Sequence, residues 1–283
     1  MSKKLCVITG ATSGIGRQTA LALARKGAQV IIVGRNEKKC IRTVNDIKKI
    51  SANSSIDFIC ADLSSLRQVR EVAQNITKRY RCLDVLINNA GGYFITRQQS
   101  VDGYEMNLAL NYLSPFLLSL LLVDMLKVSD QGRIINVSSQ AHTRGKINFS
   151  DFQQWHNFTG LDFTGLDAYA QSKLAIILFT YELARKLQGS NVTVNALHPG
   201  LVASNFGKNN GLIRFYVRRL LKRNELTPEE GAKTSIYLAS SAALDQCSGG
   251  YYMNESLVDS SSASYDQSVA SQLWSITKAL VEV

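Results

Sequence analysis

The segment DAYAQSKLA, residues 167–175, places a tyrosine and a lysine four positions apart, Tyr169 and Lys173. If this segment is helical, both side chains lie on one face, one turn apart. An ammonium beside a phenol favours the phenolate, so the pair could give and take a proton. The same spacing also fits a tyrosine at the edge of the core beside a lysine that reaches water. The elements around the pair must decide between these interpretations.

Apolar segments alternate with amphipathic ones along the chain. Nearly continuous apolar runs such as VIIV and VLIN are typical of parallel strands that are buried on both faces. The alternation predicts a single α/β domain over 1–283, a doubly wound (Rossmann) parallel sheet with helices on both faces. The predicted strands are 5–9, 29–34, 56–60, 83–88, 132–138 and 191–197, and the predicted helices are 14–26, 36–50, 65–80, 102–127, 167–188 and 266–281. Two long connections, near 140–166 and 201–226, are expected to be substrate loops.

Composition narrows the class of protein. Five cysteines without a C-x-x-C pair, and only three histidines, argue against a disulfide framework and against a metal site. They favour a reducing, cytoplasmic location. The net charge is +10, but no basic block is interleaved with stacking aromatics, so we expect no nucleic-acid partner. An anionic cofactor explains the charge better.

Membrane insertion is not expected from the sequence. The chain runs directly into its first predicted strand with no signal peptide. The most apolar stretch, 108–126, is interrupted by Asn111, Ser114, Pro115 and Asp124 and falls short of a clean membrane span. We interpret it as a buried helix that could also face a second subunit.

Three glycines of VITGATSGIG lie between the first predicted strand and the first predicted helix. Their spacing, G-x-x-x-G-x-G, permits a tight turn and close approach of the backbone to a ligand. Free N–H groups at the helix N-terminus then favour a pyrophosphate, although the glycines could also serve only to cap the helix. The cofactor-binding candidates in this turn are Gly10, Thr12, Ser13, Gly14, Ile15 and Gly16.

Basic residues follow the second predicted strand, where an acidic residue usually marks an NAD site. Arg35 stands there with Asn36, Lys38 and Lys39 beside it, and Arg17 follows the last glycine of the turn. Such cations suit a ribose 2′-phosphate. We therefore predict NADP(H) as the cofactor, with Arg35 and Asn36 in its site. A solvated basic helix start is the alternative interpretation.

Further motifs recur at the ends of the predicted strands. In order they are TGATSGIG (9–16), ADL (61–63), NNAG (88–91), Asn111 in LNYLSPF, NVSS (136–139), YAQSK (169–173) and HPG (198–200). With them the chain resembles the short-chain dehydrogenase/reductase family over nearly its whole length. The stretch NVSSQAH and the late LWSITKAL are most similar to the retinol dehydrogenase group. That resemblance implies NADP(H) and a lipophilic retinoid-, steroid- or lipid-aldehyde-like substrate, although the hydrophobic N-terminal anchor of several members is not seen here.

The resemblance also implies where the cofactor lies. Asp62 and Leu63 would contact its adenine end, and the segment after the fourth strand would line its cleft or would only stabilise the sheet. Tyr169 and Lys173 would reach the nicotinamide ribose. The remaining cofactor-binding candidates are Asn89, Ala90, Gly91, Pro199, Gly200 and Val202.

The catalytic roles follow from the same resemblance. Tyr169 would be the general acid/base, with its pKa, ordinarily about 10, lowered by Lys173. Ser139 would hydrogen-bond the reacting oxygen, and we prefer it to Ser138 because the family pattern favours the second serine. Asn111 would support a water-mediated proton route through Lys173, or would be only a buried packing residue. With NADPH in a reducing cytosol, carbonyl reduction is the expected direction.

The two long connections should supply the walls of a pocket for an apolar substrate. The segment 211–224 interleaves apolar residues with cations, as in a helix on an anionic membrane, or as in a lid whose basic face meets water. A membrane-associated location is therefore an additional hypothesis, and the family resemblance implies a homodimer through the fourth and fifth helices. A non-catalytic NADPH-binding sensor or interaction module is the alternative function. The expected aromatic and aliphatic wall residues of the first connection are Phe149, Phe152, Trp155, Phe158, Leu161 and Phe163.

Overall fold

An eight-stranded sheet forms the centre of the computed structural model, which describes residues 1–153, 165–202 and 225–283. The strands run in the order β3-β2-β1-β4-β5-β6-β7-β8, and every pair is parallel except β7 with β8. They are β1 (Leu5–Thr9), β2 (Gln29–Gly34), β3 (Ile56–Cys60), β4 (Val85–Asn88), β5 (Gly132–Val137), β6 (Val192–His198), β7 (Tyr251–Met253) and β8 (Ser256–Leu257). The strand order reverses between β1 and β4, which is where a doubly wound sheet binds its ligand.

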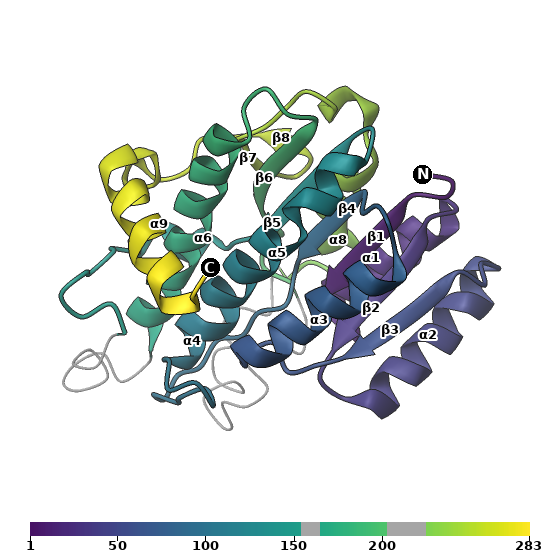
Figure 1. The fold of residues 1–283 in the computed structure, drawn as a ribbon, viewed down its shortest axis with the longest axis horizontal. Coiled ribbons are helices and arrows are strands. Elements are labelled where there is room, and N and C mark those ends of the chain that lie inside the picture. Colours follow the sequence, from purple (N-terminus) through teal and green to yellow (C-terminus); the bar gives the residue numbers. More distant parts are fainter. Residues whose placement is uncertain (154–164, 203–224) are drawn as a thin grey trace.

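Helices cover both faces of this sheet (Figure 1). They are α1 (Gly14–Arg25), α2 (Glu37–Ser51), α3 (Leu66–Arg79), α4 (Met106–Leu108), α5 (Ser114–Val128), α6 (Leu166–Lys186), α8 (Pro228–Ser240) and α9 (Gln267–Val281). Successive strand residues point to opposite faces, so Val7 belongs to the hydrophobic core that includes residues of α3, α5, α6 and α9, whereas Ile8 belongs to the core that includes residues of α1, α2 and α8. The doubly wound α/β fold predicted from the sequence is confirmed.

Six strands and six helices agree with the sequence prediction to within a few residues. The largest difference lies in the predicted helix 102–127, which begins only at Met106 and contains a π-helical segment, Ala109–Leu113, between α4 and α5. The prediction missed α8, β7 and β8 altogether. Both of these strands are short: β7 has three residues and β8 has two.

The apolar stretch from Met106 to Val128 is long and apolar enough to cross a membrane, but 72% of its most apolar window is buried inside the protein. This burial agrees with the prediction of a core helix. The helix α9 lies against α6 (Figure 1), and its Trp274 ring is 5.1 Å from Phe116 of α5 and 6.0 Å from Phe179 of α6. A homodimer through α5 and α6, which stays a prediction, would have to avoid the area that α9 covers.

Candidate active site

The turn between β1 and α1 has a backbone that only glycine adopts readily. Gly10 and Gly14 have φ angles of +66° and +56°. A Cβ atom at Gly10 would lie 2.8 Å from Ala90 Cα. The cap residue Ser13 makes no side-chain hydrogen bond to the helix, so the first N–H groups of α1 are left for another acceptor. The turn therefore fits the pyrophosphate of a dinucleotide.

Asn89 and Ala90 hold this turn against the end of β4. The Asn89 side chain donates to the Thr9 carbonyl at 2.8 Å, and the backbone N–H groups of Asn89 and Ala90 donate to Thr9 Oγ1 at 3.0 and 2.9 Å. The sequence prediction did not include Thr9 among the site residues, although it opens the TGATSGIG motif. These contacts support the interpretation of NNAG as a stabilising turn and place it beside the glycine turn between β1 and α1.

The side chains expected at the adenosine end of the cofactor differ in whether they are already bonded within the chain. Arg35 is exposed and takes part in none of the hydrogen bonds or ion pairs found among the described residues. The Asn36 side chain accepts from Lys39 N at 3.0 Å and so caps α2. Arg17 lies 3.4 Å from Asp46 of α2. Arg35 is therefore an available cation directly after β2.

At the next strand end, Asp62 and Leu63 are largely engaged within the chain. One Asp62 carboxylate oxygen accepts from the backbone N–H of Ser64 at 3.0 Å and from its hydroxyl at 2.8 Å. The Leu63 side chain is buried in the core. Both residues lie next to β3, as expected, and any contact of Leu63 with an adenine would come from its backbone.

Tyr169 and Lys173 lie one turn apart on α6, and Lys173 Nζ is 5.8 Å from the centre of the Tyr169 ring. The Tyr169 hydroxyl is hydrogen-bonded to the Ser139 side chain. Lys173 Nζ donates to the carbonyl of Val137 at 3.0 Å. The structure therefore brings together, at the carboxyl end of β5, the predicted proton-transfer pair and the serine predicted to orient the reacting oxygen.

Burial decides the charge of this pair. It raises the pKa of Tyr169 to about 12, with the hydrogen bond from Ser139 lowering it and the nearby Tyr93 raising it further. Burial also lowers the pKa of Lys173 to about 8. Burial thus opposes the charged forms of both side chains. The predicted lowering of the Tyr169 pKa by Lys173 is not among the causes of this shift and stays a prediction.

Asn111 lies in the π-helical segment, and its side-chain amide is bonded within the chain. Its oxygen accepts from Gly92 N at 2.8 Å, and its nitrogen donates to Gly92 O and to Ser172 Oγ, both at 3.0 Å. These bonds favour the packing interpretation of Asn111. It nevertheless lies near the proton-transfer pair, since a Cβ at Gly91 would be 3.0 Å from its Oδ1 and 3.5 Å from Lys173 Nζ.

Tyr93 is a neighbour of the site that sequence reasoning missed. Its ring centre lies 5.1 Å from that of Tyr169, at an angle of 52°, and the residue is half-buried. Tyr93 lies two residues after the NNAG motif, and this position is the sequence feature that could have marked it as a neighbour of the site.

The segment after β6 supplies the last predicted cofactor contacts. Gly200 has a φ angle of +82°, and Val202 forms an isolated parallel bridge with Leu226. Pro199, Gly200 and Val202 thus continue from the carboxyl end of β6, which pairs with β5. Their contact with the nicotinamide, which the resemblance implies, stays a prediction.

The expected pocket walls are only partly described. Phe152 is a core residue, edge-on to Tyr112 with ring centres 6.4 Å apart, and Phe149 is partly buried against the same core. The expected place of Phe152 in a substrate pocket stays a prediction. Trp155, Phe158, Leu161, Phe163 and the segment 211–224 lie outside the described residues.

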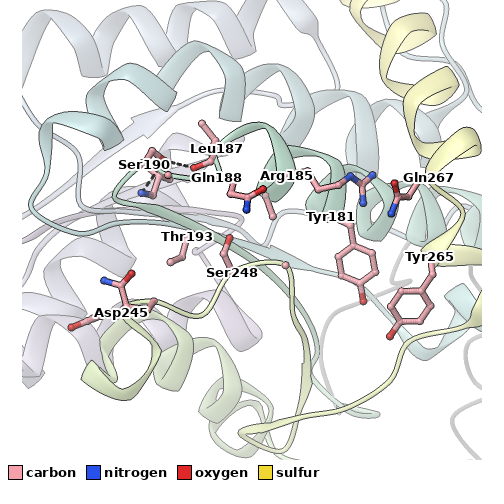
Figure 2. A pocket seen from close by; sticks show the side chains of 15 residues that line it. Tyr181, Arg185, Leu187, Gln188, Ser190, Thr193, Asp245, Ser248, Tyr265 and Gln267 are labelled. Atoms are coloured by element: carbon pink, nitrogen blue, oxygen red, sulfur yellow. Dashed lines mark hydrogen bonds between the residues drawn. The ribbon is translucent and has the colours of Figure 1, made fainter.

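A cavity of about 560 Å³ lies elsewhere, between the end of α6 and the start of β6. Figure 2 shows Tyr181 and Tyr265 on one side of it, with stacked rings 5.4 Å apart, and Asp245 on the other. Because it adjoins the amino end of β6, this cavity is at the opposite edge of the sheet from Tyr169 and Ser139.

Comparisons with known proteins agree with this geometry. Residues 4–152 match the short chain dehydrogenase family, and residues 160–276 match the enoyl-(acyl carrier protein) reductase family. The chain is 40% identical to retinol dehydrogenase 13 from Homo sapiens over 289 residues, covering 98% of this chain and 84% of that protein. It is 39% identical to polyprenol dehydrogenase from Homo sapiens over 283 residues, covering 96% and 83%.

Solved structures are similar over most of the chain. An uncharacterised protein from Mycobacterium paratuberculosis has a TM-score of 0.79 at 30% identity, covering 100% of this chain and 94% of that one. A putative NAD(P)-dependent gluconate 5-dehydrogenase from Beutenbergia cavernae, with bound NADP, has a TM-score of 0.70 at 28% identity, covering 90% and 96%.

Proposed function

The chain belongs to the short-chain dehydrogenase/reductase family, and we propose that it is an NADP(H)-dependent oxidoreductase acting on a lipophilic carbonyl or alcohol as a single domain. The observation that carries the proposal is the hydrogen bond between Tyr169 and Ser139, beside Lys173, at the carboxyl end of β5. A glycine turn suited to a pyrophosphate lies at the same edge of the sheet. Relatives named for retinol and polyprenol, both lipophilic alcohols, support the substrate class.

The raised pKa of Tyr169 suits the reductive direction. With a pKa of about 12 the phenol is protonated at neutral pH and can give its proton to a carbonyl oxygen. The Ser139 hydroxyl donates a second hydrogen bond to the same oxygen and orients it. Lys173, with a pKa of about 8, is mainly protonated at pH 7 and stabilises the phenolate left behind. The nicotinamide, when bound, supplies the hydride.

The choice of NADP(H) over NAD(H) rests on Arg35. It is exposed beyond the end of β2 and is not engaged by the described part of the chain, so its guanidinium is available for a ribose 2′-phosphate. The NADP bound in the gluconate 5-dehydrogenase relative supports this choice.

Substitution of Tyr169 by phenylalanine tests the proposal. We expect Tyr169→Phe to lower NADPH-dependent reduction of retinoid, steroid and lipid aldehydes by about 10²- to 10⁴-fold, because the proton donor is lost. The affinity for NADPH, followed by its fluorescence, should stay close to that of the wild type.

Two outcomes would contradict the proposal. Wild-type turnover by Tyr169→Phe would remove Tyr169 from the reaction. Absence of NADPH consumption by the wild-type protein, across the whole panel of carbonyl compounds, would favour the alternative of a non-catalytic NADPH-binding module.

A further inference from the structure

The peptide group between Ser139 and Gln140 is bonded at both of its polar atoms to imidazole rings. The Ser139 carbonyl oxygen lies 2.8 Å from Nδ1 of His142, and the Gln140 N–H donates to Nδ1 of His198 at 3.2 Å. His142 lies in the 3₁₀ turn Gln140–Arg144, and His198 is the last residue of β6. Two segments that are 56 residues apart in the chain therefore hold one peptide, directly after the serine of the proposed site.

The hydrogen bonds fix which ring nitrogen carries the proton. Nε2 of His142 accepts from the Ser261 N–H at 3.0 Å, so its Nδ1 carries the hydrogen and donates to Ser139 O. Nδ1 of His198 accepts, so its Nε2 carries the hydrogen. Both rings must be neutral for these bonds to form together.

The surroundings keep both rings neutral. Burial lowers the pKa of His142, which is 1% exposed. Burial, followed by repulsion from His142 and Lys173, lowers the pKa of His198 to about 4. The Lys173 ammonium thus favours neutral His198, whose Nδ1 can accept a hydrogen bond from the Gln140 N–H.

We propose that His142 and His198 are positioning residues, which clamp the Ser139–Gln140 peptide and so aim the Ser139 hydroxyl at the reacting oxygen. The proposal rests on the proposed function, since it assigns Ser139 a role in the reaction. Ser139 Oγ caps the following turn, accepting from Ala141 N at 3.2 Å, and it is bonded to Tyr169. Rotation of the peptide between Ser139 and Ala141 would disturb both of these bonds.

The clamp acts at one peptide and is not needed to hold the strand. Ser138, one residue earlier, is already fixed by its N–H on Leu197 O at 2.7 Å and by its hydroxyl on Lys173 O at 2.8 Å. Loss of a histidine ring should therefore shift Ser139 while leaving β5 paired with β6.

Substitutions at His198 test the clamp. His198→Ala removes the acceptor, whereas His198→Asn offers a carboxamide oxygen close to the position of Nδ1. We expect His198→Ala to lower kcat roughly tenfold through misplacement of Ser139, with the dissociation constant of NADPH unchanged within about twofold. His198→Asn should recover most of the loss. Unchanged kcat in His198→Ala, or an equal loss in His198→Asn, would overturn the proposal.

Substitutions at Gln140 remove the other half of the same bond. Gln140→Pro deletes the N–H, and Ser139 already has the extended backbone that a residue before proline needs, with φ −157° and ψ 154°. Gln140→Pro should lower kcat as much as His198→Ala does, and the variant that combines both substitutions should have a kcat no lower than either single variant. Gln140→Ala keeps the N–H and should behave as the wild type. Additive losses, or a loss in Gln140→Ala, would contradict the clamp.

Nitrogen NMR of the wild-type protein gives a readout that needs no substrate. The chain has three histidines, so the ring signals are few. We expect a proton on Nδ1 of His142 and on Nε2 of His198 at pH 7. The opposite tautomers in an active enzyme would overturn the clamp alone. The expected tautomers in a protein that reduces no carbonyl compound would overturn the proposed function and, with it, the role of the clamp.

Discussion

Among single residues, Lys173 carries the charge that pH can remove from the site. Its pKa of about 8 lies below that of an ordinary lysine because the ammonium is buried. The charged form therefore predominates below about pH 8 and is lost above it. No carboxylate is among the causes of this shift. Burial disfavours the ammonium, and the Val137 carbonyl accepts a hydrogen bond from it.

This titration predicts a fall in kcat/KM for carbonyl reduction as the pH rises through about 8, because a neutral Lys173 cannot stabilise the phenolate. Initial rates between pH 6 and 10 would measure it. Lys173→Arg, whose side chain stays charged throughout this range, should lack the step at pH 8 even if its overall rate is lower. A wild-type profile that is flat to pH 9.5 would contradict the assignment.

Arg35 carries the prediction for cofactor choice. Arg35→Asp should weaken NADPH binding roughly tenfold or more, because a charge-assisted hydrogen bond is replaced by repulsion, and should improve NADH relative to NADPH. Equilibrium titration with both cofactors would measure the two constants. Lys39→Ala removes another exposed cation of the same region and should change the preference little. An equal effect of both substitutions would indicate only a general influence of charge.

The positions of site residues were predictable from the sequence where a motif carries them. Tyr169, Lys173 and Ser139 were placed correctly at one edge of the sheet. Thr9 and His142 were not singled out, because their partners are distant in the sequence. Asn89 lies 80 positions after Thr9, and Ser261 lies 119 positions after His142. The burial that raises the Tyr169 pKa was not predicted, because spacing does not reveal burial.

At the scale of elements, continuous apolar runs made the parallel strands predictable, and amphipathic periodicity did the same for the long helices. The short strands β7 and β8 have too few residues for a pattern to be visible. The π-helical segment Ala109–Leu113 was missed because one extra residue in a turn leaves the apolar pattern nearly unchanged.

The helix α9 supplies a prediction of stability. Leu273 is 1% exposed and belongs to the core shared with α5 and α6. Leu273→Ala should lower the free energy of unfolding by about 2–5 kcal/mol, because it leaves a cavity at this contact. Denaturant unfolding would measure the loss, with the exposed Ser275→Ala as a control close to wild type. A change below about 0.5 kcal/mol in Leu273→Ala would show that α9 is only loosely attached.

For the whole molecule, the two clamped histidines make stability depend on pH. Their pKa values in the folded protein lie below the ordinary 6.5, and that of His198 is about 4. Between about pH 4 and pH 6.5 these histidines bind protons in the unfolded chain but stay neutral in the folded protein, so the free energy of unfolding rises with pH. Their contribution is therefore complete above about pH 6.5 and falls away towards pH 4.

Thermal unfolding measured from pH 4.5 to 7.5 should show this loss as a falling midpoint temperature below about pH 6.5. His198→Asn has no titrating ring, so its profile should be flatter over the same interval. Carboxylates lose their contribution to stability at lower pH. Burial raises the pKa of Glu182, but its bonds to Arg185 and Lys186 outweigh burial and lower it, so its contribution is lost only below about pH 4.5. Identical profiles for the two proteins would contradict a half-buried, neutral His198.

The bond from Ser261 to His142 has a consequence for biosynthesis. A ribosome adds Ser261 after it has made every other residue of the site, so a growing chain can form its nucleotide turn well before His142 gains that partner. Translation order thus delays the last adjustment of Ser139 until the emerging polypeptide has passed the final strand of the sheet.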